Sequence, residues 1–163
     1  MRRLLIIPFL SLLGCSTHPS IEYTDQKDIS LNSVHWNEYT SQRIIADITS
    51  QMLKSSKFSK DKFYAFGHIR NDTLDHPDTK MLADSIVTIL KNEGNLNFVA
   101  YKEDNPKHKI DGYCTGSLYG DMQHDSNQRI MDFILQIKCT NTKTDLRIWS
   151  GQTKKSNRLE KGW

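Results

Sequence analysis

The sequence predicts an α/β fold. We expect a two-layer sandwich in which helices cover a mostly antiparallel sheet with a C-terminal three-stranded meander. Three observations predict this fold: two segments carry apolar residues at helical spacing, short apolar segments follow each of them, and the last third alternates apolar with polar residues in three runs. A chain of 163 residues is long enough for one domain with terminal extensions.

The first predicted helix covers residues 36–53. Ile44, Ile48 and Met52 recur there at positions i, i+4 and i+8, which places them on one face of a helix. A polar break at residues 57–62 follows, so we expect the helix to end before it.

A strand, a second helix and a short strand are predicted next. Residues 63–69 are rich in aromatic side chains and form the first strand. Asp78 or Thr79 caps the second helix, and Gly94 is expected to end it. The short strand covers residues 98–101. The apolar stripe of the second helix consists of Leu82, Ile86, Ile89 and Leu90.

The last third predicts a meander with one buried face. Apolar residues occupy mostly even positions in residues 110–122 and odd positions in residues 131–139. Leu146 and Ile148 continue the pattern in a third run. Turn residues at 125–127 separate the first two runs.

The pairing of the first two runs brings two cysteines together. Opposed residues in a hairpin share one sum of residue numbers, and Cys114 with Cys139 gives the same sum as Ser126 with Asn127 at the turn. Directly opposed Cα atoms lie within disulfide range. The pair forms either a disulfide or two small buried hydrophobic side chains.

The N-terminus predicts a bacterial lipoprotein signal. Met1, Arg2 and Arg3 precede an apolar run at residues 4–13, which is too short to span a bilayer. The stretch Leu12-Leu13-Gly14-Cys15-Ser16 then has the lipobox pattern, in which the Cys15 thiol accepts a diacylglyceryl group. The serine after Cys15 favours the outer membrane. We expect a signal peptide at residues 1–14, a flexible tether at 15–34 and one domain at 35–163.

Charge and motifs argue against several classes of function. The net charge of +3 is too small for nucleic-acid binding. The six histidines do not have metal-ligand spacing, and the chain has no Gly-rich phosphate loop, so we expect no catalytic residues, metal or cofactor. A polar cluster of Asp72, Asp75, His76 and Asp78 is either a metal or acid/base site or, as we expect, a loop with a helix cap.

Several stretches resemble the LpoB family of penicillin-binding protein activators. They are Arg70-Asn71-Asp72-Thr73, the helix start at Asp78-Thr79, the pair Gly116-Ser117, and the ending from Leu146 through Ile148-Trp149-Ser150-Gly151 to Trp163. The resemblance runs from about Tyr39 to the C-terminus, and the lipobox agrees with it.

This resemblance implies a non-catalytic regulator. Such a protein is anchored in the outer membrane by its lipid, faces the periplasm, binds the regulatory domain of a class A penicillin-binding protein, and stimulates peptidoglycan synthesis. No small-molecule substrate or nucleic acid is implied. The alternative is an outer-membrane lipoprotein of similar fold that scaffolds an export or envelope assembly.

The polar face of the meander is the expected contact surface. Exposed tyrosine and arginine are frequent in binding hot spots, and strands hold side chains on a rigid platform. The same face could also be merely solvated, and the loop at residues 71–78 with the C-terminal tail is a second candidate. The candidate partner-binding residues are Tyr119, Asp121, Asp132, Gln136 and Arg147.

Overall fold

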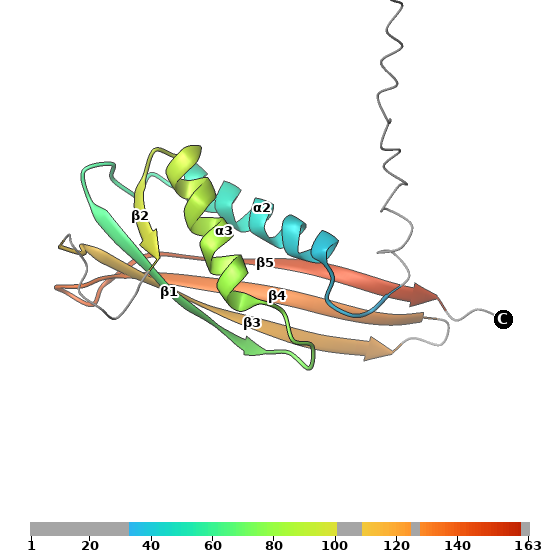
Figure 1. Cartoon of the computed structure of the whole chain (residues 1–163). Coiled ribbons are helices and arrows are strands. Elements are labelled where there is room, and N and C mark those ends of the chain that lie inside the picture. The colour runs from blue at the N-terminus through green and yellow to red at the C-terminus, as the bar shows by residue number, and fades with distance from the viewer. Residues whose placement is uncertain (1–32, 101–108, 125–127, 161–163) are drawn as a thin grey trace, which may run out of the picture.

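The computed structural model describes residues 33–100, 109–124 and 128–160 (Figure 1). The predicted signal peptide, Cys15 and most of the predicted tether lie outside these residues. In chain order the elements are α2 (Glu38–Lys54), β1 (Phe63–Asp72), α3 (Thr79–Asn92), β2 (Asn97–Ala100), β3 (Gly112–His124), β4 (Gln128–Asn141) and β5 (Arg147–Glu160). No helix within the described residues is long and apolar enough to cross a membrane.

The five strands form one mixed sheet in the order β2-β1-β3-β4-β5. β1 runs parallel to both of its neighbours, whereas β3, β4 and β5 pair antiparallel in succession. The expectation of a mostly antiparallel sheet is therefore corrected, because two of the four pairings are parallel. The α/β class is right, since both helices lie on one face of the sheet; in the part of the chain that the structure describes, nothing covers the other face (Figure 1).

The parallel pairing of β1 with β2 follows from the helix between them. A hairpin turn reverses a strand, but a helical crossover returns the chain in the same direction. α3 provides this crossover, and it packs on both β1 and β2. The residue pattern predicts the helix and both strands, but it does not indicate whether the two strands run parallel or antiparallel.

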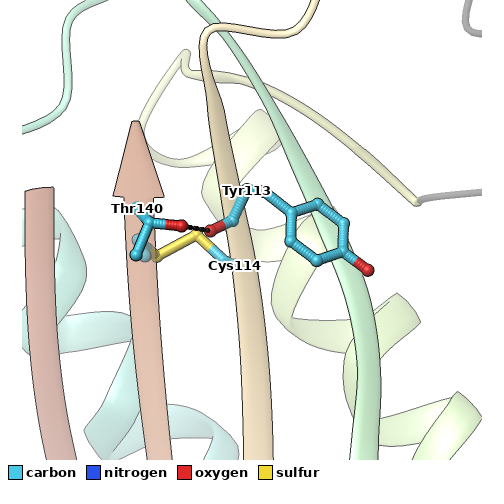
Figure 2. Close-up of a disulfide and its surroundings, with 4 residues drawn as sticks. Tyr113, Cys114 and Thr140 are labelled. Atoms are coloured by element: carbon cyan, nitrogen blue, oxygen red, sulfur yellow. Dashed lines mark hydrogen bonds between the residues drawn. A yellow bond between two sulfur atoms is a disulfide. The ribbon is translucent and has the colours of Figure 1, made fainter. Parts of the chain in front are cut away.

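β3 and β4 pair in the predicted register, with Cys114 opposite Cys139. Their Cα atoms are 4.0 Å apart, and a disulfide joins them under the helices. Figure 2 shows this bridge behind the sheet, with the Tyr113 side chain on the other side. Burial follows the predicted parity through Leu118 in β3 and Leu135 in β4.

The helix caps are partly as predicted. The Asp78 carboxylate accepts a hydrogen bond from the Met81 backbone N–H at 2.8 Å and begins α3. At the other end, the left-handed residue is Asn95 (φ 49°) and not Gly94. Gly94 instead allows a close approach, because a Cβ there would lie 2.4 Å from Leu53 at the end of α2.

The core contains aromatic residues that the sequence analysis did not assign to it. Phe58 lies in the predicted polar break but is 8% exposed, and its ring packs edge-on against Tyr64 and Phe98. Trp36 packs edge-on against Phe133, with the ring centroids 5.1 Å apart. Val34, which was assigned to the tether, is also buried in this core.

β5 departs furthest from the expectation. It continues to Glu160 as a 14-residue strand along the edge of the sheet, whereas the analysis expected only a short run near Leu146 and Ile148. A register irregularity at Cys139/Thr140 changes which residues face the helices. Odd-numbered residues such as Thr153 and Asn157 are consequently buried, and Leu146, which precedes the strand, is 69% exposed.

Candidate interaction surface

The uncovered face of the sheet presents a regular array of side chains, which we call the open face. Alternate residues of β3, β4 and β5 point to it, and the register aligns them in rows across the three strands. The rows are, in order, Tyr113, Thr140 and Arg147; Thr115, Lys138 and Ser150; Ser117, Gln136 and Gln152; Tyr119, Ile134 and Lys154; Asp121, Asp132 and Ser156; and Gln123, Ile130 and Arg158.

All five candidate partner-binding residues lie on the open face. Tyr119, Asp121, Gln136 and Arg147 are half-buried or exposed. Asp132 differs from them, because its side chain is only 3% exposed. Its carboxylate is therefore inaccessible to a partner and instead holds neighbouring side chains of the open face in place.

Asp132 is held by three polar side chains. Lys154 Nζ lies 2.5 Å from its Oδ2, the Ser156 hydroxyl donates to Oδ1 at 2.5 Å, and the Gln123 amide donates at 3.2 Å. Desolvation raises the pKa of Asp132, but the hydrogen bonds from Lys154 and Ser156 outweigh it, so the pKa lies below its ordinary value. The carboxylate is thus ionised and paired at neutral pH.

A second ion pair neutralises the open face where β1 joins it. Arg70 Nε donates to the Asp72 carboxylate at 2.9 Å, and a second guanidinium nitrogen lies 2.8 Å from the same oxygen. This hydrogen bond and the Asp72 charge raise the pKa of Arg70, with a smaller contribution from Tyr119. Tyr119 lies opposite Asp72 in the pairing of β1 with β3, so it stands beside this ion pair.

Around Gln136, the open face forms a depression of about 590 Å³. Gln136 and Gln152 join across β4 and β5 by an amide hydrogen bond of 3.1 Å. Among the described residues, Lys138 and Arg147 are the charged side chains that line it, and no carboxylate does. Gln136 and Arg147 are among the residues predicted from the sequence, whereas Lys138 and Gln152 are not. The parity of β4 indicates Lys138, but Gln152 has the parity that the run at Leu146 and Ile148 assigns to the core, and the register irregularity places it on the open face.

The aromatic ring of Tyr113 extends from β3 across β1 (Figure 2). The absence of a side chain at Gly67 permits this position, because a Cβ there would lie 2.2 Å from the Tyr113 hydroxyl oxygen. Gly67 is buried and Tyr113 half-buried, so the ring forms part of the surface.

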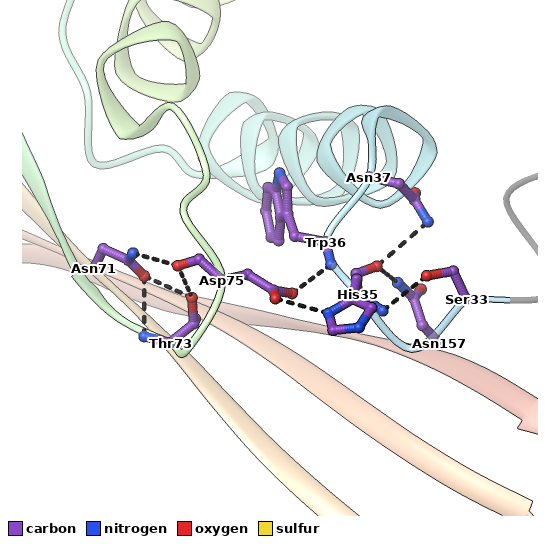
Figure 3. A network of polar contacts seen from close by, with 8 residues as sticks. All are labelled: Ser33, His35, Trp36, Asn37, Asn71, Thr73, Asp75 and Asn157. Atoms are coloured by element: carbon purple, nitrogen blue, oxygen red, sulfur yellow. Dashed lines mark hydrogen bonds and ion pairs between the residues drawn. The ribbon is translucent and has the colours of Figure 1, made fainter.

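On the helix side, a polar network fixes the segment before α2 (Figure 3). Asp75 accepts a hydrogen bond from the Trp36 backbone N–H at 2.5 Å, and His35 Nδ1 lies 3.0 Å from the same carboxylate. The Asn157 amide of β5 donates to the His35 carbonyl at 2.8 Å, and the Thr40 hydroxyl donates to Asn157. This segment therefore approaches the domain on the helix-covered side and leaves the open face clear.

The acidic residues of the polar cluster predicted at residues 72–78 have separate structural roles. Asp75 holds the segment before α2, Asp78 caps α3, and Asp72 pairs with Arg70 on the other side of the sheet. Within the described ranges, no group of three His, Cys, Asp or Glu side chains is placed to hold a metal ion. The acidic residues of this cluster thus have structural roles, and the open face is the candidate functional site.

These features define a class of protein: a small two-layer α/β domain with one bare sheet face. Within this class, the family model described as "Peptidoglycan-synthase activator LpoB" matches residues 36–110. The resemblance to the LpoB family is thereby confirmed, and the matched description is that of an activator and not of an enzyme.

Solved structures of LpoB domains share the fold. The LpoB C-terminal domain from Salmonella enterica superposes with a TM-score of 0.52 at 15% identity, covering 72% of this chain and 98% of that one. The corresponding domain from Escherichia coli gives the same TM-score and identity, covering 73% and 100%. A search of curated protein sequences gives no significant match.

Proposed function

We propose that this protein is an outer-membrane-anchored lipoprotein that binds and activates a class A penicillin-binding protein. The observation that carries the proposal is the LpoB sequence pattern over residues 36–110, joined to the fold of whole LpoB C-terminal domains. The chain regulates synthesis by contact and carries no catalytic group of its own. Its docking site on the synthase is the regulatory domain, and its working environment is the periplasm.

The open face is the proposed docking surface. It is rigid, because β3 and β4 pair over thirteen successive residue pairs and a disulfide crosses them. No described element covers it, since both helices pack on the other side (Figure 1). Tyr119 and Arg147 are of the residue types most often found as binding hot spots.

The lipid anchor is proposed from the N-terminal sequence. Cys15 lies outside the described residues, and the lipobox pattern around it supports the proposal. The network of His35, Asp75 and Asn157 brings the chain to the domain on the side opposite the open face.

Binding and activity assays with a purified class A synthase test the proposal. We expect the full chain in detergent to bind the periplasmic part of the synthase and to accelerate glycan polymerisation. Tyr119→Ala or Arg147→Glu should weaken binding by about 1–3 kcal/mol, as for a hot-spot residue, with little change in melting temperature. Absence of binding by the folded wild-type protein contradicts the proposal.

Two further results would redirect the assignment. If both variants bind normally but removal of residues 161–163 abolishes binding, the contact belongs to the C-terminal tail. The truncation must stop there, because Asn157 belongs to β5 and holds the segment before α2. If crosslinking in cells recovers components of an export assembly and no penicillin-binding protein, the scaffold alternative is favoured.

A further inference from the structure

The charged residues of the open face divide into two groups. Towards one end of β4, Lys154 is paired with Asp132, and Arg70 is paired with Asp72 where β1 joins the face. Asp121 and Arg158 lie towards the same end and carry opposite charges, so the charges there sum to zero. At the other end, Lys138 and Arg147 have no ion-pair partner within the part of the chain that the structure describes. One end of this face is neutralised internally, and the other keeps its positive charge.

The two unpaired cations are close neighbours. Lys138 is opposite Ser150, and Arg147 is opposite Thr140, two residues further along β4 on the same face. Such diagonal neighbours lie about 7–8 Å apart at Cα, within reach of long side chains. Like charges at this spacing repel each other. A carboxylate between them would be attracted by both cations and would also reduce their mutual repulsion.

The surroundings of the two cations suit a carboxylate. The depression offers the hydroxyl groups of Thr115, Ser117 and Ser150 as hydrogen-bond donors, and none of the described residues that line it is acidic. The hydrogen bond between Gln136 and Gln152 orders one side of it. An arginine binds a carboxylate through two parallel hydrogen bonds, and a lysine adds a mobile point charge.

From this arrangement we infer that the depression around Lys138 and Arg147 binds an acidic segment of the partner synthase. This inference rests on the proposed function and deepens it, because it assigns the partner's chemistry at one end of the open face. The segment places an Asp or Glu carboxylate between Lys138 and Arg147. The neutralised end, around Tyr119, provides contact area without net charge.

The test compares charge-reversal variants in binding to the purified periplasmic part of a class A synthase. We expect Lys138→Glu and Arg147→Glu each to raise the Kd at least tenfold. Lys91→Glu is the matched control, since it makes the same charge change at an exposed position on α3, on the covered side of the sheet. It should stay within about twofold of wild type. Wild-type binding should weaken with added salt, and less steeply in the two open-face variants.

The outcomes separate the inference from the proposed function. If wild type binds and both open-face variants bind as tightly, the inference is overturned while the proposed function stands. If the folded wild-type protein does not bind the synthase, the proposed function fails, and the inference falls with it.

Isolated peptidoglycan is the second probe, because its stem peptides also carry carboxylates. If Lys138→Glu and Arg147→Glu lose binding to peptidoglycan but keep wild-type affinity for the synthase, the acidic-segment inference is overturned. The depression is then assigned to the cell-wall polymer. Circular dichroism melting of each variant shows that it is folded, since both side chains are exposed and their replacement leaves the core intact.

Discussion

At the scale of single residues, Asp132 shows how a charged group shapes the open face without being accessible on it. Its carboxylate is surrounded by Lys154, Ser156 and Gln123, and it stands directly opposite Asp121 on β3. A buried carboxylate is tolerated only where partners replace its hydration. Lys154, which is 53% exposed along its side chain, supplies the compensating charge.

Removing this charge should destabilise the protein at neutral pH. We expect Asp132→Asn to lower the free energy of unfolding by about 1–3 kcal/mol, the usual cost of losing a hydrogen bond to a charged group. Urea unfolding at pH 7 measures it. Asp61→Asn is the control, because Asp61 is exposed in the loop before β1.

The effect should depend on pH in one direction. The pKa of folded Asp132 lies below its ordinary value, so its stabilisation is complete above the unfolded pKa of about 4 and is lost as the pH falls through the folded value. The difference between wild type and Asp132→Asn should therefore shrink between about pH 5 and pH 2. A difference that grows on acidification would contradict the pairing with Lys154.

At the scale of elements, the Asp75 network connects the loop before α3 to the segment before α2 and to β5. Asp75 accepts from the Trp36 N–H, and Asn71 in turn donates to the Asp75 carbonyl at 2.9 Å (Figure 3). The same segment carries Trp36, whose ring packs on Phe133. The polar network and the aromatic contact therefore hold one short stretch of chain.

Asp75→Ala should release this stretch. We expect a loss of about 1–3 kcal/mol in unfolding free energy, because the Trp36 N–H and the groups around it lose a charged acceptor. Hydrogen exchange at the Trp36 amide should become faster. His76→Ala is the control, since His76 is the exposed next residue. Unchanged exchange at Trp36 would show that the carboxylate does not hold the segment.

The disulfide is the covalent connection between β3 and β4. Cys114 and Cys139 are both fully buried and 25 residues apart. Closing a loop of this length restricts the unfolded chain and stabilises the fold by about 3 kcal/mol in the chain-entropy account. We expect reductant to lower the free energy of unfolding by that amount. The Cys114→Ala, Cys139→Ala double variant should not respond to reductant.

Alkylation checks the same bond independently. Oxidised protein, unfolded without reductant, should leave both cysteines unlabelled. Full labelling under those conditions would show free thiols, and the register of β3 and β4 would then rest on the ladder and the apolar contacts alone.

At the scale of the whole molecule, the described chain begins on the side of the sheet opposite the proposed docking surface. The chain reaches Val34 and Trp36 on the helix side, whereas the open face lies on the other side of the sheet. Cys15 precedes Val34 by a segment that, fully extended, spans roughly 60–70 Å. Two or more acyl chains on Cys15 would make the anchor stable.

Cys15→Ala should abolish lipidation. We expect the variant to leave the detergent phase in a phase-partition assay, or to accumulate as the uncleaved precursor, because the thiol is the acceptor of the lipid. Ser16→Ala, one residue away, should still partition with detergent. If Cys15→Ala partitions like wild type, the lipobox interpretation is wrong.

Local patterns determined much of the fold. Alternation in β3 and β4, together with the turn between them, predicted their register and the apposition of Cys114 with Cys139. Helical spacing predicted α2 and α3, and capping preferences predicted Asp78 or Thr79 as the cap of α3, of which the structure has Asp78. These features depend on residues close in sequence or joined by one turn, where the period of the side chains carries the information.

Only the tertiary structure decided the features that depend on distant segments. The parallel pairing of β1 follows from how α3 crosses the sheet, and the register irregularity at Cys139/Thr140 decides which face each β5 residue occupies. That irregularity aligns Arg147 with the open-face residues of β4 and leaves it near Lys138. The sequence by itself determined the LpoB resemblance and a polar sheet face. Two features of the open face depend on how three strands pack together. Asp132 is paired with Lys154, and Lys138 and Arg147 have no ion-pair partner within the described residues. The local period of side chains does not encode either feature.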